Sequence, residues 1–98
     1  MPKKYPPLTP KEVISILKAR GFAYIRTSGS HEHYEGIIKN IRRIVTVDLH
    51  YNQFSDKLIK YMIAQSGLTR DEFYGSTKQT AKKINLSSKV YPIPLKGG

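Results

Sequence analysis

Apolar residues recur at helical spacing near the start of the chain. Val13, Ile16 and Leu17 lie on one stripe, which predicts an amphipathic helix. Thr9 precedes this stripe as a good N-cap, and Gly21 follows it as a left-handed C-cap. The pattern therefore predicts a helix that begins after Thr9 and ends before Gly21.

A second helical stripe follows later in the chain and is formed by Leu58, Ile59, Met62 and Ile63. It predicts a helix over about Ser55 to Ser66, which Gly67 ends as a second glycine cap. Thr69 is then placed to cap a one-turn helix, and Glu72 stands at the position that closes a capping box.

Between the two helices apolar and polar residues alternate, which is the pattern of half-buried strands. The alternation and its interruptions predict three strands, over residues 22–26, 31–38 and 41–50. We expect a turn at Thr27-Ser28-Gly29 between the first two strands, and a two-residue hairpin turn at Lys39-Asn40 between the last two. Gly36 interrupts the second strand and is expected to mark a bulge.

The predicted order of elements is α-β-β-β-α with a short terminal helix. Sequential strands joined by tight turns favour a three-stranded antiparallel sheet, with the helices packed on one face and the other face open to water. This α+β arrangement matches the double-stranded-RNA-binding fold class. We expect the domain to occupy residues 9–74, after an extended Pro-rich lead-in at 1–8 and before a basic, flexible C-terminal arm at 75–98.

The hairpin turn decides which residues face each other across the second and third strands. If Lys39-Asn40 is a two-residue turn, His33 lies opposite Thr46 and His31 lies opposite Asp48. Five polar side chains would then point away from the helices: His31, His33, Thr46, Asp48 and His50.

The same register leads to two further predictions. Tyr34 would point inward beside Val45. A carboxylate across from His31 would raise the pKa of its imidazole and fix its tautomer by accepting one ring proton. A bulge at Gly36 that slips the pairing by one residue would break this arrangement.

The chain carries a strong positive charge. Seventeen Lys and Arg residues against seven Asp and Glu residues give a formal net charge of +10. A basic surface of this density attracts polyanions, of which nucleic acid is the commonest. The charge is also compatible with a role in solubility alone, and with a surface that an acidic protein partner covers.

Further features of the sequence argue against disulfides, thiolate metal sites and membrane-spanning helices. The sequence has no cysteine, which excludes disulfides and thiolate metal sites. No apolar run approaches the roughly 18 residues of a membrane-spanning helix. No apolar export segment follows residues 1–4, so we expect a cytoplasmic protein without a membrane anchor.

Histidine is the side chain best suited to acid–base chemistry near neutral pH. An imidazole on the exposed face can take the proton of a ribose 2′-hydroxyl, or protonate the leaving oxygen of a phosphodiester. Arg26, Arg42 and Arg43 are the candidates that would offset negative charge building on phosphorus. RNA supplies its own nucleophile, so this chemistry requires neither a metal nor a cofactor.

The histidines also allow two simpler roles. On residue type alone, His33 is more often an ordinary cross-strand residue than a catalyst. The His31-x-His33 pair together with His50 is also a geometry that zinc accepts, although spacing alone is a weak indication of a metal site.

A set of residues carries a resemblance to a known family: Gly21-Phe22, Arg26, Gly29-Ser30-His31, Tyr34, Val45-Thr46-Val47, His50, Gln65-Ser66-Gly67-Leu68-Thr69 and Glu72-Phe73. Over about residues 9–74 the chain resembles the HicA toxin family. The resemblance implies a small ribonuclease of a type II toxin-antitoxin system, with the double-stranded-RNA-binding-like fold, that cleaves mRNA. It also implies that a HicB antitoxin silences the protein by covering its active face, and that the histidine of the Gly-Ser-His step, His31, is catalytic.

The sequence departs from the family pattern at three places. Glu32 stands where many members have a second histidine, and a carboxylate there would weaken the contact of the working imidazole with phosphate. The hairpin is longer than usual, with residues 36–40 in place of a short turn. After His50, residues 51–54 replace a glycine-rich turn.

The residues and the resemblance together define the expected site. His31 is expected to be catalytic. The residues expected to bind or orient RNA are Arg26, Gly29, Ser30, His33, Tyr34, Arg42, Arg43, Asp48 and His50. We expect no metal and no cofactor, RNA and a HicB-like antitoxin as partners, and either a monomer or a hetero-oligomer with the antitoxin.

Two alternative functions are compatible with the same sequence. A non-catalytic RNA-binding module would keep the charge and the fold, and loss of His31 would leave its RNA affinity nearly unchanged. A basic unit that binds an acidic protein would bind RNA weakly even at low salt, whereas real phosphate contacts give an affinity that falls steeply as salt rises. The endoribonuclease toxin is the leading hypothesis.

Overall fold

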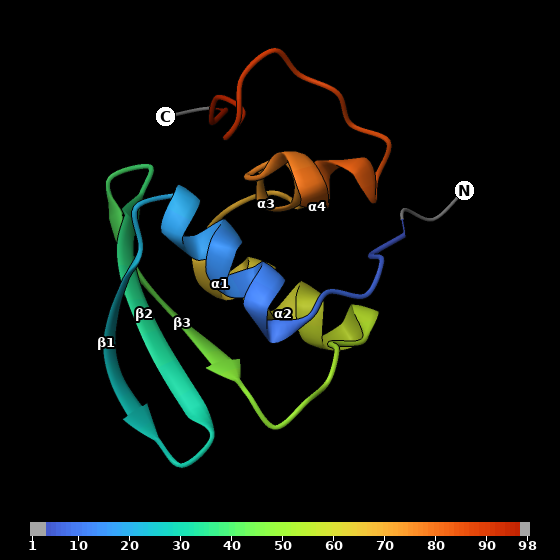
Figure 1. Cartoon of the computed structure of the whole chain (residues 1–98). Helices are drawn as coiled ribbons and strands as arrows, with labels where there is room; N and C mark the ends of the chain where they lie inside the picture. The colour runs from blue at the N-terminus through green and yellow to red at the C-terminus, as the bar shows by residue number, and fades with distance from the viewer. Residues whose placement is uncertain (1–3, 97–98) are drawn as a thin grey trace.

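A computed structural model describes residues 4–96 of the chain (Figure 1). Its elements are, in order, α1 (Pro10–Ala19), β1 (Ala23–Ser28), β2 (His31–Ile38), β3 (Ile41–Asp48), α2 (Asp56–Ser66), α3 (Arg70–Tyr74) and α4 (Lys78–Lys82). None of the helices in this part of the chain is long and apolar enough to cross a bilayer.

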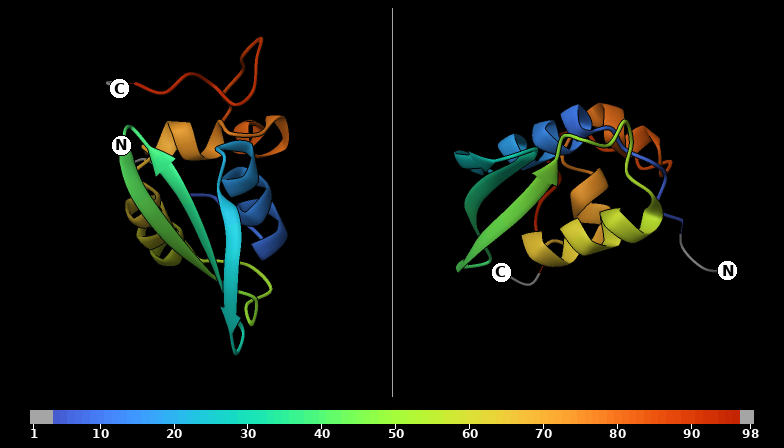
Figure 2. Two further views of the ribbon diagram at one scale, coloured as in Figure 1. Left: turned by 90° about the vertical axis from the view of Figure 1, so that its left-hand side faces the viewer. Right: turned by 90° about the horizontal axis from the view of Figure 1, so that it is seen from below.

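The strands form one antiparallel sheet in the order β1-β2-β3, and the fold is α+β as predicted. The helices pack on one face of this sheet, and α2 runs close to β3 (Figure 2). The order α-β-β-β-α of the first five elements is compatible with the double-stranded-RNA-binding fold class. The opposite face of the sheet is therefore not covered by any helix of residues 4–96.

The helix starts follow the capping chemistry that the sequence predicts. At α1 the Thr9 backbone N–H donates to Glu12 Oε1 at 2.9 Å, and the Glu12 N–H donates back to Thr9 Oγ1 at 3.1 Å. Thr69 and Glu72 form the same reciprocal pair at α3. The glycines that follow α1 and α2 have φ angles of +86° and +76°, which glycine adopts without the strain a Cβ would cause.

The hairpin between β2 and β3 confirms the predicted register. Both residues of Lys39-Asn40 have positive φ angles, 52° and 68°, as a two-residue turn of the primed type requires. His31 lies opposite Asp48 and His33 lies opposite Thr46, and the pairing of the two strands runs without a shift. The histidines of β2 therefore face away from the helices.

The first strand differs from its prediction. β1 runs from Ala23 to Ser28, beyond its expected end, so the turn to β2 falls at Gly29-Ser30. Its pairing with β2 shifts between Tyr24 and Arg26, where β1 carries one residue more than its partner. The bulge of this sheet thus lies in β1.

Gly36 makes room for packing, and the prediction that it marks a bulge was wrong. A Cβ at this position would lie 2.8 Å from Cγ of Phe22, whose ring is buried against the strand. The third strand also ends earlier than predicted, at Asp48, and His50 lies in the turn that follows. Strand pairing therefore does not fix the position of His50.

The core lies between the sheet and the helices. Its buried apolar residues include Val13, Ile16, Leu17, Tyr34, Val45, Val47, Ile59, Met62, Phe73 and Tyr74. Tyr34 points inward opposite Val45, as predicted. Leu8, from the expected lead-in, is fully buried and forms a β-bridge with Phe54. Residues 1–3 of that lead-in lie outside the described residues.

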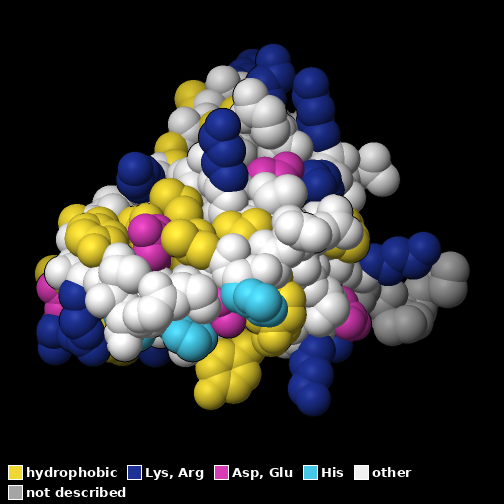
Figure 3. Space-filling view, turned by 60° about the horizontal axis from the view of Figure 1, so that its bottom comes forward, with side chains coloured by type: hydrophobic (Ala, Val, Ile, Leu, Met, Phe, Trp, Pro, Cys, Tyr) yellow, Lys and Arg dark blue, Asp and Glu magenta, His cyan; other side chains and the backbone are white. Residues whose placement is uncertain are grey.

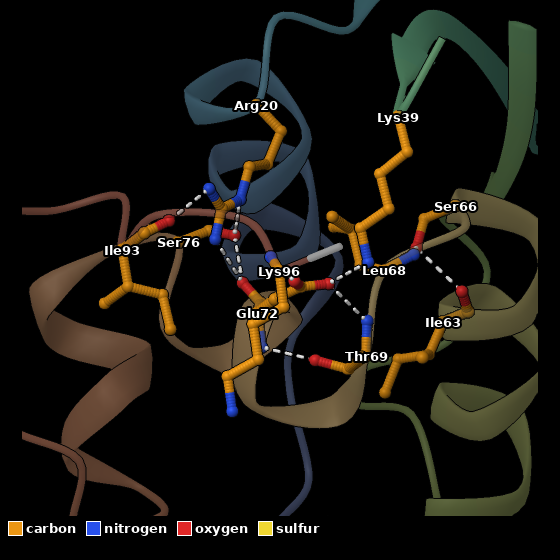
Figure 4. Close-up of polar contacts among 10 residues, drawn as sticks. All are labelled: Arg20, Lys39, Ile63, Ser66, Leu68, Thr69, Glu72, Ser76, Ile93 and Lys96. Atoms are coloured by element: carbon orange, nitrogen blue, oxygen red, sulfur yellow. Dashed lines mark hydrogen bonds and ion pairs between the residues drawn. The ribbon is translucent and has the colours of Figure 1, made fainter. Parts of the chain in front are cut away.

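The segment after Gly75 has more structure than the sequence predicts for a flexible arm. It forms α4, and then returns to the domain, where the Ile93 N–H donates to Gly75 O at 3.1 Å. The Lys96 N–H donates to Glu72 Oε2 at 2.7 Å, and Arg20 Nη1 donates to Ile93 O at 2.7 Å (Figure 4). These contacts lay the segment across α3; residues 97–98 are outside the described part.

Candidate active site

His31 and Asp48 form an ion pair at one end of the β2–β3 hairpin. They are the first residue of β2 and the last residue of β3, and they face each other across the sheet. His31 Nε2 lies 3.2 Å from Asp48 Oδ2, and the exposed fractions of the two side chains are 51% and 24%. The imidazole is therefore held by a partly buried carboxylate and still open to solvent.

Asp48 accepts further hydrogen bonds that stabilise its charged form. The Ser30 hydroxyl donates to Asp48 Oδ1 at 2.7 Å, and the His50 backbone N–H donates to the same oxygen at 2.9 Å. The Ser30 hydrogen bond is the main reason that the pKa of Asp48 lies below its ordinary value; the His50 N–H and the charge of His31 act in the same direction. Asp48 is thus ionised near neutral pH.

This contact assigns different roles to the two nitrogens of His31. In the neutral ring the carboxylate favours the proton on Nε2, where it can be donated to Asp48 Oδ2. The lone pair is then on Nδ1, which is the nitrogen available to an incoming proton. The pair therefore produces an oriented imidazole that can act as a base.

The turn before His31 supports this arrangement. Gly29 has a φ of +62°, which suits glycine. Ser30, the next residue, binds Asp48 through its hydroxyl and accepts a hydrogen bond from the Leu49 N–H at 2.8 Å through its carbonyl. The Gly-Ser-His step thus ties the β1–β2 turn to the end of β3.

Further polar residues lie on the same face of the sheet. His33 Nδ1 and Thr46 Oγ1 share a hydrogen bond of 3.0 Å, and Arg26 pairs with His33 from β1. Arg42 is also on this face, where it forms an ion pair with Glu35. Arg26 is exposed and contributes positive charge one strand away from the histidines.

Three expected site residues lie elsewhere. Tyr34 is buried on the core face, where its hydroxyl donates to Glu32 Oε1 at 2.9 Å. Burial, helped by this hydrogen bond, raises the pKa of Tyr34 to about 12. Arg43 shares that face, because it alternates with Arg42, and its guanidinium packs against Gly67. His50 lies in the turn, with its ring edge-to-face on Tyr51 at 5.9 Å.

The position of Glu32 removes the expected conflict with His31. Adjacent residues of a strand point to opposite faces, so the Glu32 carboxylate lies on the core face with Tyr34 and not beside the imidazole. The departure from the family pattern at this position therefore leaves the histidine face unchanged.

Next to His31 the surface is hollowed by a groove of about 430 Å³ that the sequence pattern did not predict. Its lining consists of His31, Thr46, Asp48, Tyr51, Phe54, Leu58, Tyr61, Met62 and Gln65. In Figure 3 histidine and hydrophobic side chains lie side by side on this face, and Lys and Arg side chains project around it. The i, i+3, i+4, i+7 spacing of the four α2 residues in this lining is the sequence signal that could have indicated the groove.

Within residues 4–96, no group of three or more His, Cys, Asp or Glu side chains comes together that could hold a metal ion. His31 is engaged with Asp48, His33 with Thr46, and His50 with Tyr51. The zinc arrangement of the three histidines is therefore not formed in this structure.

The family to which this chain belongs follows from a comparison with models of known families. The model of the HicA toxin of bacterial toxin-antitoxin systems matches residues 10–68, more than half of the chain. The match covers α1, the whole sheet and α2, which are the elements that hold His31, Asp48 and the groove. A search of curated proteins found no match. The chain belongs to the HicA toxin family of bacterial toxin-antitoxin systems.

Proposed function

We propose that this toxin is an endoribonuclease that cleaves mRNA, with His31 as the general acid–base residue. The observation that carries the proposal is the His31–Asp48 pair, in which a half-exposed imidazole is oriented by an ionised carboxylate. This pair lies on the open face of a strongly basic domain, where a polyanion can reach it. Cleavage of mRNA would take place in the cytoplasm.

The reaction uses the nucleophile that RNA carries. His31 Nδ1 accepts the proton of a ribose 2′-hydroxyl as that oxygen attacks the adjacent phosphorus. The bond from phosphorus to the 5′ oxygen breaks, and the 5′ oxygen takes up a proton from water, while His31 releases the proton that it accepted to the solvent. The products are a 2′,3′-cyclic phosphate and a 5′-hydroxyl. Asp48 stabilises the imidazolium that forms when His31 has taken the proton.

Positive charge near the pair would stabilise the additional negative charge on phosphorus. Arg26 is the best placed of the three arginines considered, since it is exposed and pairs with His33 on the same face. Arg42 is partly neutralised by Glu35, and Arg43 packs against Gly67 on the core face. We therefore assign the electrostatic role to Arg26.

Family membership implies an antitoxin as the partner of this chain. We propose that it is a HicB-like protein with an acidic surface that covers the histidine face and excludes RNA from it. The net charge of +10 favours such a partner, and the open face of the sheet provides the area for it. Without the antitoxin we expect the toxin to be a monomer.

The test compares the purified wild type with His31→Ala on a single-stranded RNA substrate. General acid–base catalysis contributes about 10²- to 10⁴-fold, so we expect kcat to fall by about that factor. His33→Ala, on the same strand and face, is the matched control and should cost much less. The 3′ ends of the products are examined for a cyclic phosphate.

Binding is measured in parallel, with RNA carrying 2′-O-methyl groups that block the attacking oxygen. We expect His31→Ala to bind this RNA nearly as well as the wild type. Cleavage by His31→Ala at the wild-type rate would remove His31 from the mechanism. RNA binding without cleavage by the wild type would identify the chain as a non-catalytic RNA-binding module.

A further inference from the structure

We propose that the groove beside His31 is a subsite for one unpaired nucleobase of single-stranded RNA, next to the phosphodiester that is cleaved. The proposal rests on the proposed function, because it places the base relative to the reacting phosphate. It adds a binding place for one base of the RNA and a residue that holds this base, Tyr61.

The groove has an aromatic wall that the core does not use. Tyr61 projects from α2 with 69% of its surface exposed, and Tyr51 is 42% exposed at the other side. Tyr51 itself packs on Phe54, with the two ring centres 5.9 Å apart. Leu58 and Met62, which are less exposed than the two tyrosines, also line the groove. A flat ring placed here would have aromatic and apolar contacts on more than one side.

The helix that forms this wall has two adjacent apolar stripes. Ile59, Met62, Ile63 and Ser66 are buried against the core. Leu58, Tyr61, Met62 and Gln65 line the groove and are turned toward β3. Met62 and Leu58 also pack in or against the core, whereas Tyr61 is left largely exposed by the packing of the domain and is available to a ligand.

The charges around the groove decide which ligand it suits. Among the described residues, Asp48 is the acidic group of the lining, it is ionised, and the lining contains no lysine or arginine. A phosphate, or a carboxylate of an acidic partner, would be repelled in the part of the groove beside Asp48. A nucleobase is uncharged and aromatic, and every base has a face that can stack on Tyr61. The basic residues lie outside the groove, where the sugar-phosphate backbone would run.

Polar atoms at the end of the groove can meet the edge of a base. The Thr46 N–H donates to Gln65 Oε1 at 3.1 Å, which fixes the Gln65 side chain between β3 and α2. Gln65 lines the groove, and its amide nitrogen donates to no acceptor within residues 4–96. A base that stacks on Tyr61 would thus find a hydrogen-bond donor at its edge.

A base can enter this groove only if it is not stacked and paired in a duplex. Duplex RNA presents its backbone and its shallow minor groove to a protein, whereas bases in single strands can be splayed out and stacked on aromatic side chains. We therefore expect single-stranded RNA to be the substrate and duplex RNA of the same sequence to be cleaved poorly.

The experiment measures binding of wild type, Tyr61→Ala and Tyr61→Phe to a 2′-O-methyl oligouridine by fluorescence anisotropy. Loss of one stacked base weakens binding by about 5- to 100-fold, so we expect Tyr61→Ala to lose affinity by that factor and Tyr61→Phe to keep it. Tyr24→Ala is the matched control, because Tyr24 is 51% exposed and lies outside the groove.

A second measurement distinguishes the loss of base stacking from a general loss of contact surface on the protein. The affinities of wild type and of Tyr61→Ala are measured for oligouridines that each carry one abasic position. If Tyr61 stacks on one base, one abasic position weakens wild-type binding, and at that position Tyr61→Ala has no further effect.

The outcomes separate this inference from the proposed function. If Tyr61→Ala weakens binding but His31→Ala still cleaves, the base subsite stands and the His31 mechanism is wrong. Unchanged RNA binding and cleavage by Tyr61→Ala would overturn the base subsite. If Tyr61→Ala affects only binding of the antitoxin, the groove is an antitoxin site and the base subsite is wrong.

Discussion

Asp48 receives most of the polar contacts around His31, which makes it the residue that positions the imidazole. It accepts from His31 Nε2, from the Ser30 hydroxyl and from the His50 N–H. Asp48 does not touch the reacting atoms in the proposed mechanism. Its effect is to orient the ring and to stabilise the imidazolium.

Replacement of Asp48 by asparagine tests this positioning role. Asn keeps the shape but loses the charge, and its NH₂ group can face the ring and favour the wrong tautomer. We expect kcat to fall by roughly 10- to 100-fold, less than for His31→Ala, while KM changes little. An unchanged kcat would show that Asp48 is not a positioning residue.

At the same scale, the sequence correctly predicts that His31 pairs with Asp48. It also assigns both Arg42 and Arg43 to the expected site, although their side chains cannot reach the same face of the sheet. Arg42 and Arg43 are neighbours in one strand and so lie on opposite faces. The alternation rule that placed His31 and His33 correctly also separates these two residues. The guanidinium of Arg43 packs against Gly67, a long-range contact that no local pattern indicates.

At the scale of elements, Gly36 couples the sheet to the segment that follows α1. The strand passes directly over the Phe22 ring, and a Cβ would approach three of its carbons at 2.8 to 3.0 Å. The glycine is needed for close approach, although its sequence context is also that of a bulge. Local sequence alone does not distinguish these two uses of a strand glycine.

Gly36→Ala is therefore expected to destabilise the fold by about 1–3 kcal/mol, as other overpacked positions do. The free energy of unfolding is measured by urea denaturation. Phe22→Leu offers the matched test, because the smaller side chain leaves room for the added methyl group. In the double variant the two losses should not add, and strict additivity would argue against the contact.

The β1 strand shows why element boundaries were harder to predict than element types. Its length and its bulge between Tyr24 and Arg26 depend on pairing with β2, which a local pattern does not contain. The β2–β3 hairpin was predicted in full, because Lys39-Asn40 is a turn with its own chemistry and the flanking alternation is regular. The groove was missed because the predicted stripe of α2 was assigned to the core, although Leu58 and Met62 of that stripe also line the groove, and because Tyr61 and Gln65 beside it were not considered.

At the scale of the whole molecule, Glu72 joins three distant segments (Figure 4). Its Oε1 accepts from the Thr69 N–H at 2.8 Å and from Lys39 Nζ at 3.0 Å, and its Oε2 accepts from the Lys96 N–H at 2.7 Å. The hairpin turn, α3 and the C-terminal segment are thus connected through one buried carboxylate. The sequence indicates only the capping role of Glu72, because its partners Lys39 and Lys96 are remote in the chain.

The protonation of Glu72 should make stability depend on pH. Burial raises the pKa of Glu72, but the Lys96 and Thr69 amides and the Lys39 ammonium outweigh burial, so the pKa lies below its ordinary value of 4.5. The contribution of the carboxylate to stability is therefore present above that value, and it is lost as the pH falls through the lower pKa of the folded state.

Glu72→Gln isolates this contribution. We expect a loss of about 1–3 kcal/mol at neutral pH, because the amide cannot accept all three hydrogen bonds. We also expect a weaker decline of stability in acid than the wild type shows, measured by thermal unfolding across pH. Asp71→Asn, on the same helix but with a more exposed carboxylate, is the control. Identical pH profiles for wild type and Glu72→Gln would contradict the assignment.

The contact between Thr46 and Gln65 has a consequence for assembly. Because an amide on the outer side of β3 is satisfied by α2, that border of the sheet is closed to a further strand. β1 forms the opposite border, and all six of its residues are exposed. Any peptide that extends this sheet by main-chain hydrogen bonding, including a second copy in an aggregate, has to add beside β1. Substitutions meant to improve solubility belong at Tyr24 and Ile25, which are exposed and lie at the end of β1 remote from His31.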